Sequence, residues 1–397
     1  MGYIRETGFP GARRILVLYR DTWYYTTMKY SDIEAYPEHA FTKYWRSLLA
    51  DPHFLEIIKS LGKHSASTGR KWLENGREMM SGIRSSVDFH RMMVRLVETV
   101  VDHTTEGLSF SGIENIPQDR GVCFLSNHRS TSLDPAFVNA VLYKNFTRTA
   151  YNAAGDNIFK TNWLGHLIRL NRGFIVRRDV DDIDEKRAEA QKLSGYINTL
   201  LEDKQWVWIA HRNGRSKDGW DQTDSAVLTM LKMDRPDASW QDYTETNALV
   251  PVSISWELIP LDILMAKELC DIPTYHGPQR DMKNIVTEIG MKKKRVHIHF
   301  SSPVTAEKRA QLVRGTDAGI QAGQTIWPAN WVAAQELNPD LDLPESVDAN
   351  QGMWILQRAD ELEQSIAAEG HSFQQALAVR TTLLRMYARP VLKTLLS

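Results

Sequence analysis

From Gly107 onward, short apolar runs alternate with stretches of helical spacing, and this rhythm constrains the fold more than any other feature. The apolar runs have the length of strands and lie at Leu108–Ile113, Val122–Leu125, Thr147–Tyr151, Gly173–Val176, Trp206–Ala210, Val250–Ser255 and Val296–Phe300. Helical stretches fill the gaps at Pro135–Tyr143, Ile158–Leu170, Ile183–Leu201 and Asp224–Met233. This alternation predicts an α/β fold with a mostly parallel sheet flanked by helices.

Both ends of the chain have helical spacing instead. Phe54, Ile57, Ile58 and Leu61 form one apolar stripe at helical intervals. Near the other end, Phe373, Leu377 and Leu384 are expected on one helix face, with Pro390 ending that helix. We therefore predict a helical N-terminal region at 1–104, an α/β domain at 105–303 and a helical C-terminal region at 304–397.

Charge and cysteine content exclude several classes of protein. Lys and Arg number 48 and Asp and Glu number 49, so the net charge of −1 argues against a nucleic-acid partner. Two distant cysteines, Cys123 and Cys270, argue against a disulfide scaffold or structural zinc and favour a cytoplasmic protein. The longest apolar stretch, Leu249–Ala266, is interrupted by charges and Pro260, whereas a membrane-spanning helix needs about 20 apolar residues. We expect no membrane-spanning helix.

Three of the predicted strands are followed by unusually polar residues. Ser126–Pro135 contains His128 and Asp134, Arg177 and Arg178 follow the fourth strand, and His211–Gly219 follows the fifth. Ligands of open α/β sheets bind outside the carboxyl ends of the strands. We therefore expect the sheet to bring together a histidine, a carboxylate and several arginines.

This set of side chains suits attack by a hydroxyl on an activated acyl group beside a bound phosphate. His128 would take the hydroxyl proton as general base, and Asp134 would hold its imidazole tautomer. Arg177 and Arg215 offer forked donors that match phosphate oxygens. Plainer interpretations stay open, because Asp134 before Pro135 is typical of a helix N-cap and strand-end arginines are commonly solvated.

At these positions the sequence resembles the glycerolipid acyltransferases, which include glycerol-3-phosphate and 1-acylglycerol-3-phosphate acyltransferases. The family's N-H-x-S-x-x-D block is matched at its beginning by Asn127, His128, Arg129 and Ser130. Its F-I-x-R block is matched by Phe174–Arg177, its F-P-E-G-T-R-S block is echoed by Asn213–Ser216, and its V-P-V block is matched from Val250. The four blocks occur in the family's order between Gly107 and Phe300.

The resemblance implies an O-acyltransferase of phospholipid biosynthesis, with an acyl thioester of coenzyme A or acyl-carrier protein as donor. The acceptor would be the hydroxyl of glycerol-3-phosphate or of a lysophospholipid, at the cytoplasmic face of a membrane. His128 and Asp134 would be catalytic, without metal or other cofactor. Substrate would be bound by Asn127, Arg129, Ser130, Arg177, Asn213, Gly214 and Arg215. Backbone amides at the start of the Pro135 helix are candidates for the oxyanion donors.

The chain departs from the family pattern at two places. Five residues separate His128 from Asp134, one more than usual, and Asn213 stands where the family has Glu. A loop between the two residues of the dyad absorbs such an insertion better than a helix does. One alternative is a non-catalytic lipid-binding protein that keeps the fold. Another is a serine hydrolase using Ser126, Ser130 or Ser132, although no G-x-S-x-G elbow surrounds them.

Overall fold

A seven-stranded sheet forms the centre of the molecule in the computed structural model, with strand order β4-β10-β9-β5-β8-β6-β7. The structure describes residues 4–9, 12–19, 22–55, 80, 82–178, 180–275 and 280–396. The strands are β4 (Thr105–Ser111), β5 (Val122–Ser126), β6 (Tyr151–Gly155), β7 (Gly173–Val176), β8 (Trp206–Ala210), β9 (Ala248–Trp256) and β10 (Lys294–Phe300). Every neighbouring pair is parallel except β9 with β10. The predicted α/β fold class is confirmed.

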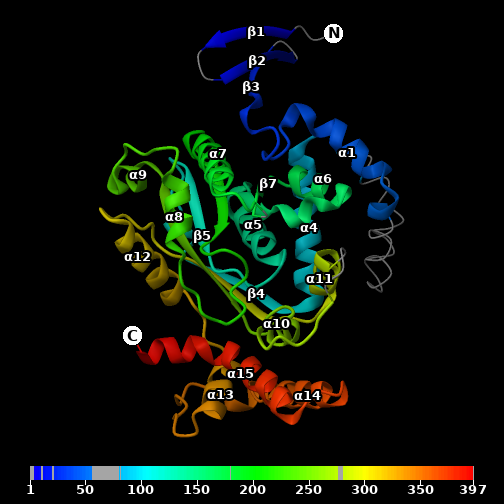
Figure 1. The fold of residues 1–397 in the computed structure, drawn as a ribbon, viewed down its shortest axis with the longest axis vertical. Coiled ribbons are helices and arrows are strands. Elements are labelled where there is room, and N and C mark those ends of the chain that lie inside the picture. Colours follow the sequence, from blue (N-terminus) through cyan, green and yellow to red (C-terminus); the bar gives the residue numbers. More distant parts are fainter. Residues whose placement is uncertain are drawn as a thin grey trace.

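Helices cover both faces of this sheet because the side chains of each central strand alternate between two apolar clusters. One face packs on α7 (Ile183–Glu202), α8 (Ser225–Lys232) and α12 (Arg309–Ala322), which lie on one side of the sheet in Figure 1. The other face packs on α4 (Ser86–Thr104), α5 (Leu133–Phe146) and α10 (Asp262–Leu269). In β5, Cys123 and Leu125 belong to the first cluster, and Val122 and Phe124 to the second.

One predicted strand lies in a different place. The sequence predicts a strand at Thr147–Tyr151, whereas α5 continues to Phe146 and β6 begins at Tyr151. Thr147 ends the helix in the left-handed conformation, with φ of 54°, and its N–H donates to the carbonyl of Tyr143 at 2.8 Å. The strand itself reads Tyr-Asn-Ala-Ala-Gly, a sequence of low β propensity that only pairing with β7 and β8 makes a strand.

The prediction of a helical N-terminal region is wrong for its first three segments, which are strands. Residues 4–9, 12–19 and 22–27 form an antiparallel sheet of three strands, β1 (Ile4–Phe9), β2 (Ala12–Tyr19) and β3 (Thr22–Thr27). The β3 segment, Thr-Trp-Tyr-Tyr-Thr-Thr, has the β-branched and aromatic composition that favours strands. Helix α1 (Phe41–Ala50) follows, while most of the apolar stripe predicted from Phe54 to Leu61 lies outside the described residues.

The C-terminal region is helical as expected, but Pro390 does not end its last helix. Helices α13 (Pro328–Leu337), α14 (Trp354–Ala368) and α15 (Phe373–Leu396) lie together at one end of the molecule in Figure 1. Pro390 lies inside α15, where an internal proline costs about 3 kcal/mol. Burial of Tyr387, Ala388 and Val391 around it offsets this cost. Phe373 and Leu377 are exposed and Leu384 is buried, so the three do not share a buried face.

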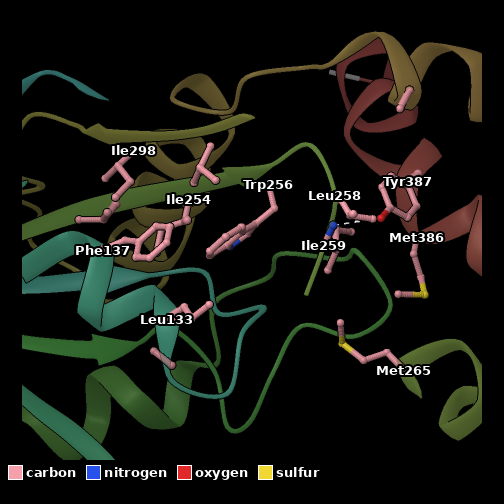
Figure 2. Close-up of a cluster of buried hydrophobic side chains, with 14 of the residues drawn as sticks. Leu133, Phe137, Ile254, Trp256, Leu258, Ile259, Met265, Ile298, Met386 and Tyr387 are labelled. Atoms are coloured by element: carbon pink, nitrogen blue, oxygen red, sulfur yellow. Dashed lines mark hydrogen bonds between the residues drawn. The ribbon is translucent and has the colours of Figure 1, made fainter. Parts of the chain in front are cut away.

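These C-terminal helices share the core of the sheet. Figure 2 shows side chains of α5, of β9 and of the turn after β9 beside those of α15, among them Phe137, Trp256, Ile259, Met386 and Tyr387. The Tyr387 hydroxyl donates to Asp262 Oδ2 at 2.8 Å and accepts from the Ile259 N–H at 3.0 Å. Helix α15 is therefore bonded to α10 and to the turn that follows β9. Within the described ranges, no helix has the length and apolar character that crossing a membrane requires.

Candidate active site

His128 and Asp134 meet at the carboxyl end of β5. The strand ends at Ser126, the residues after it form a loop, and α5 begins at Leu133. His128 Nδ1 lies 2.8 Å from Asp134 Oδ2. The predicted loop is present, so the additional residue between the two side chains does not separate them.

The Asp134 carboxylate is fully buried and accepts hydrogen bonds from several directions. Its Oδ2 accepts from the backbone N–H groups of Arg129, at 2.6 Å, and Ser130, at 2.9 Å. Its Oδ1 accepts from Trp256 Nε1 at 2.8 Å. These donors offset the cost of burying a carboxylate. The capping interpretation fails, because the N-cap is Ser132 and the Asp134 side chain reaches back to the loop.

The imidazole of His128 is held by contacts on one side and accessible on another. Its ring meets the Trp208 ring edge to face, at 5.5 Å between centroids and 77° between planes. The side chain keeps 15% of its surface exposed, and Nε2 has no hydrogen-bond partner among the described residues. A ring whose Nδ1 is bound to a carboxylate while Nε2 is available has the arrangement of a general base.

Asn127 and Arg129, predicted to bind substrate, are both buried in contacts with the protein. The Asn127 side chain accepts from the Ile254 N–H at 2.8 Å and donates to the Ile254 carbonyl at 3.2 Å. Arg129 donates to Asp221 Oδ2 and to the Ser216 carbonyl, each at 2.7 Å. The structure thus shows them anchoring the loop around His128.

Ser130 is also buried, and its hydroxyl organises the start of α5. Its Oγ accepts from the Leu133 N–H at 2.8 Å and the Ser132 N–H at 3.3 Å, and donates to Glu288 Oε2 at 3.0 Å. The Thr131 N–H donates to Glu288 as well. The backbone amides of residues 129–133, which lead into α5, are therefore bonded to side chains of the protein itself. Neither Ser126, which donates to the Asn127 carbonyl, nor Ser130 is bonded to His128.

The segment that echoes the third family block adjoins the dyad loop. The Ser216 N–H donates to the His128 carbonyl at 2.7 Å, which fixes the two segments together. Asn213 is exposed, and Gly214 has φ of +74° with open space where a Cβ would lie. Arg215 is partly exposed, but its Nη1 is buried without a hydrogen-bond partner in the described part of the chain.

Arg177 is not brought together with the dyad. It follows β7, and β6 and β8 lie between that strand and β5, so the two strand ends are separated by roughly 14 Å. Arg177 is 41% exposed and forms ion pairs with Asp32, at 2.8 Å, and Glu189, at 3.3 Å. Its guanidinium is thus occupied by carboxylates of the protein.

Two residues of the site escaped the sequence analysis, Trp256 and Glu288. Trp256 is the last residue of β9, and Glu288 lies on α11 (Arg280–Gly290). A signal for the second exists, since a carboxylate at helical spacing among Ile285 and Ile289 interrupts an apolar stripe. No group of three potential metal-ligating side chains occurs among the residues that the structure describes.

Comparison with known proteins decides what this segment is. Residues 107–237 match the family model described as Acyltransferase. This segment is an acyltransferase domain. The resemblance predicted from the sequence motifs is confirmed at this level. The acyltransferase match contains His128, Asp134, Arg177 and Arg215, whereas Trp256 and Glu288 lie beyond it.

A solved structure is also similar. It is the crystal structure of the 1-acyl-sn-glycerophosphate (LPA) acyltransferase from Thermotoga maritima, with 17% sequence identity and a TM-score of 0.37. The alignment covers 77% of this chain and 98% of that chain. No curated protein matches this chain in sequence.

Proposed function

We propose that this protein transfers a fatty acyl group from an acyl thioester to the hydroxyl of glycerol-3-phosphate or a lysophospholipid, with His128 as general base. The observation that carries the proposal is the 2.8 Å contact between His128 and the buried Asp134, beside an accessible Nε2. The loop that carries this pair adjoins the segment that carries Arg215, whose Nη1 has no partner in the described protein. Together they suit a hydroxyl acceptor that carries a phosphate.

The proposed reaction uses the histidine twice. Nε2 of neutral His128 takes the proton of the acceptor hydroxyl as its oxygen attacks the thioester carbonyl carbon. Asp134 accepts the hydrogen bond from Nδ1 and stabilises the imidazolium that forms. As the C–S bond breaks, the imidazolium returns the proton to the leaving sulfur, which yields an ester and a free thiol. Holding both substrates in line supplies a further part of the rate enhancement.

Arg215 is the arginine that we assign to the acceptor phosphate. Its segment is bonded to the dyad loop through Ser216 and His128, and its Nη1 has no partner of its own in the described protein. Donor thioesters of coenzyme A and of acyl-carrier protein both fit this chemistry. Because a lysophospholipid acceptor resides in a lipid surface, we further propose that the enzyme acts as a peripheral protein on the cytoplasmic face of a membrane.

The test compares the purified protein with His128→Ala, using long-chain acyl-CoA and acyl-carrier-protein donors with a panel of glycerophosphate and lysophospholipid acceptors. Free thiol and acylated product are followed together. We expect acceptor-dependent product that falls by at least about 100-fold in the variant. Thiol without acylated acceptor would indicate a thioesterase. Binding of donor or lipid without turnover in either protein would overturn the proposal in favour of a non-catalytic lipid-binding protein.

A further inference from the structure

Glu288 is a buried carboxylate from a distant part of the chain that contacts the dyad loop. It lies near the end of α11, has no exposed surface, and is 158 residues from Ser130 in sequence. Burial raises the pKa of this carboxyl, whereas the Thr131 N–H and the charge of Arg215 act to lower it. A buried carboxylate is costly unless it is bonded to donors, so its partners define its role.

Among the described residues, its hydrogen-bond partners lie between His128 and Asp134. Glu288 Oε1 accepts from the Thr131 N–H at 2.7 Å, and Oε2 accepts from the same N–H at 3.0 Å and from Ser130 Oγ at 3.0 Å. Ser130 in turn holds the first amides of α5. One carboxylate thus fixes the middle of the loop whose two ends carry the dyad.

The segment that carries Arg215 adjoins the loop that Glu288 holds, because the Ser216 N–H donates to the His128 carbonyl at 2.7 Å. Arg215 is close enough to act on Glu288 electrostatically, although no direct ion pair joins the two described side chains.

We propose that Glu288 is a positioning residue of the active site, which holds the loop so that Asp134 faces His128. The inference rests on the proposed acyl transfer for its kinetic consequences. The geometry of the dyad is testable without that activity. Glu288 is bonded to Ser130 and Thr131, and within the described part of the chain no hydrogen bond joins it to the imidazole of His128.

The experiment compares Glu288→Ala and Glu288→Gln with a matched control, Asp262→Asn. Asp262 is also fully buried, bonded to Arg358 and Tyr387, and belongs to the interface with α15, away from the dyad. Each protein is measured for thermal stability, for kcat and acceptor KM, and for the exchange of the His128 Nδ1 proton with water by NMR.

In the wild-type protein we expect the His128 Nδ1 proton to exchange slowly, because it is bonded to the buried Asp134. Both Glu288 variants should lose this slow exchange. The Ala variant should also lose about 100-fold in kcat, since small displacements of catalytic groups have effects of this size. The Gln variant, which keeps an acceptor for Thr131, should lose less in kcat. Asp262→Asn should lower stability and keep the Nδ1 proton.

The results can overturn the inference on its own, or the proposed function on its own. Glu288 variants that lose stability as Asp262→Asn does, with the Nδ1 proton and kcat retained, would show that Glu288 is only a buried structural residue. If Ala fails to fold, the Gln variant decides by the same criteria. Loss of the Nδ1 proton in a protein without acyl transfer would support the positioning role and refute the proposed function alone.

Discussion

At the scale of single residues, a substitution of Asp134 tests whether its carboxylate is catalytic or only structural. Asp134→Asn places an NH₂ where Oδ1 or Oδ2 now accepts from Trp256 or from the loop amides. We expect a loss of stability of about 1–3 kcal/mol from the mismatched donors and a decrease in kcat of roughly 100-fold or more. Denaturant unfolding and steady-state kinetics measure both. A folded variant with the wild-type rate would refute the dyad.

The two arginines of the sequence motifs differ in their surroundings, and this difference predicts different effects. Arg215 has a buried Nη1 without a partner beside the dyad loop, whereas Arg177 is neutralised by Asp32 and Glu189 at the sheet edge. Arg215→Ala should raise the acceptor KM by about 10-fold or more, the value of one charge-assisted hydrogen bond. Arg177→Ala, the matched control, should change it less. If Arg177→Ala raised the acceptor KM more than Arg215→Ala does, the phosphate site would lie at the end of β7 instead.

At the scale of elements, α15 shares the apolar core of the seven-stranded sheet. Its Tyr387 hydroxyl bonds both Asp262 and the Ile259 N–H, and its Lys393 donates to the Asp221 carbonyl at 2.6 Å. Asp221 in turn binds Arg129 of the dyad loop. The helix thus supports the active site through one intermediate residue.

Tyr387→Phe tests how tightly this helix is joined to the sheet. Removing the hydroxyl leaves the buried Ile259 N–H without its acceptor, so we expect a loss of about 1–3 kcal/mol. If the helix and sheet form one cooperative unit, tryptophan fluorescence and hydrogen exchange in β5 should report the same shifted transition. An early transition confined to α13–α15 would instead show a separately folding C-terminal unit.

At the scale of the whole molecule, two buried histidines make stability depend on pH. Burial lowers the pKa of His90 to about 3 and that of His211 to about 4. Unfolding exposes both to water, where a histidine binds its proton near pH 6.5. The unfolded state therefore binds more protons at mildly acidic pH, and the free energy of unfolding falls as the pH decreases from about 6.5 toward 4.

The corresponding measurement is guanidinium unfolding at about pH 7.5 and about pH 5, where we expect the lower stability at the acidic pH. His211→Gln, which cannot titrate, should reduce the difference between the two conditions. Equal differences in the wild-type protein and in this variant would show that His211 does not contribute.

The sequence by itself predicted the α/β class, most strands of the sheet and the His128–Asp134 pair. Local patterns determine these features, because an apolar run of strand length and the polar residues directly after it occupy a window of only about ten residues. It misplaced β6 and the first strands of the chain, where local composition or pairing partners had not been weighed.

Only the tertiary structure decided which distant groups complete the site. It brings Trp256 and Glu288 to the dyad loop from 122 and 158 residues away. It also separates Arg177 from the dyad by placing β8 and β6 between β5 and β7. No local pattern contains strand order or the packing of α11, since both arise from burial of apolar surface by the whole chain.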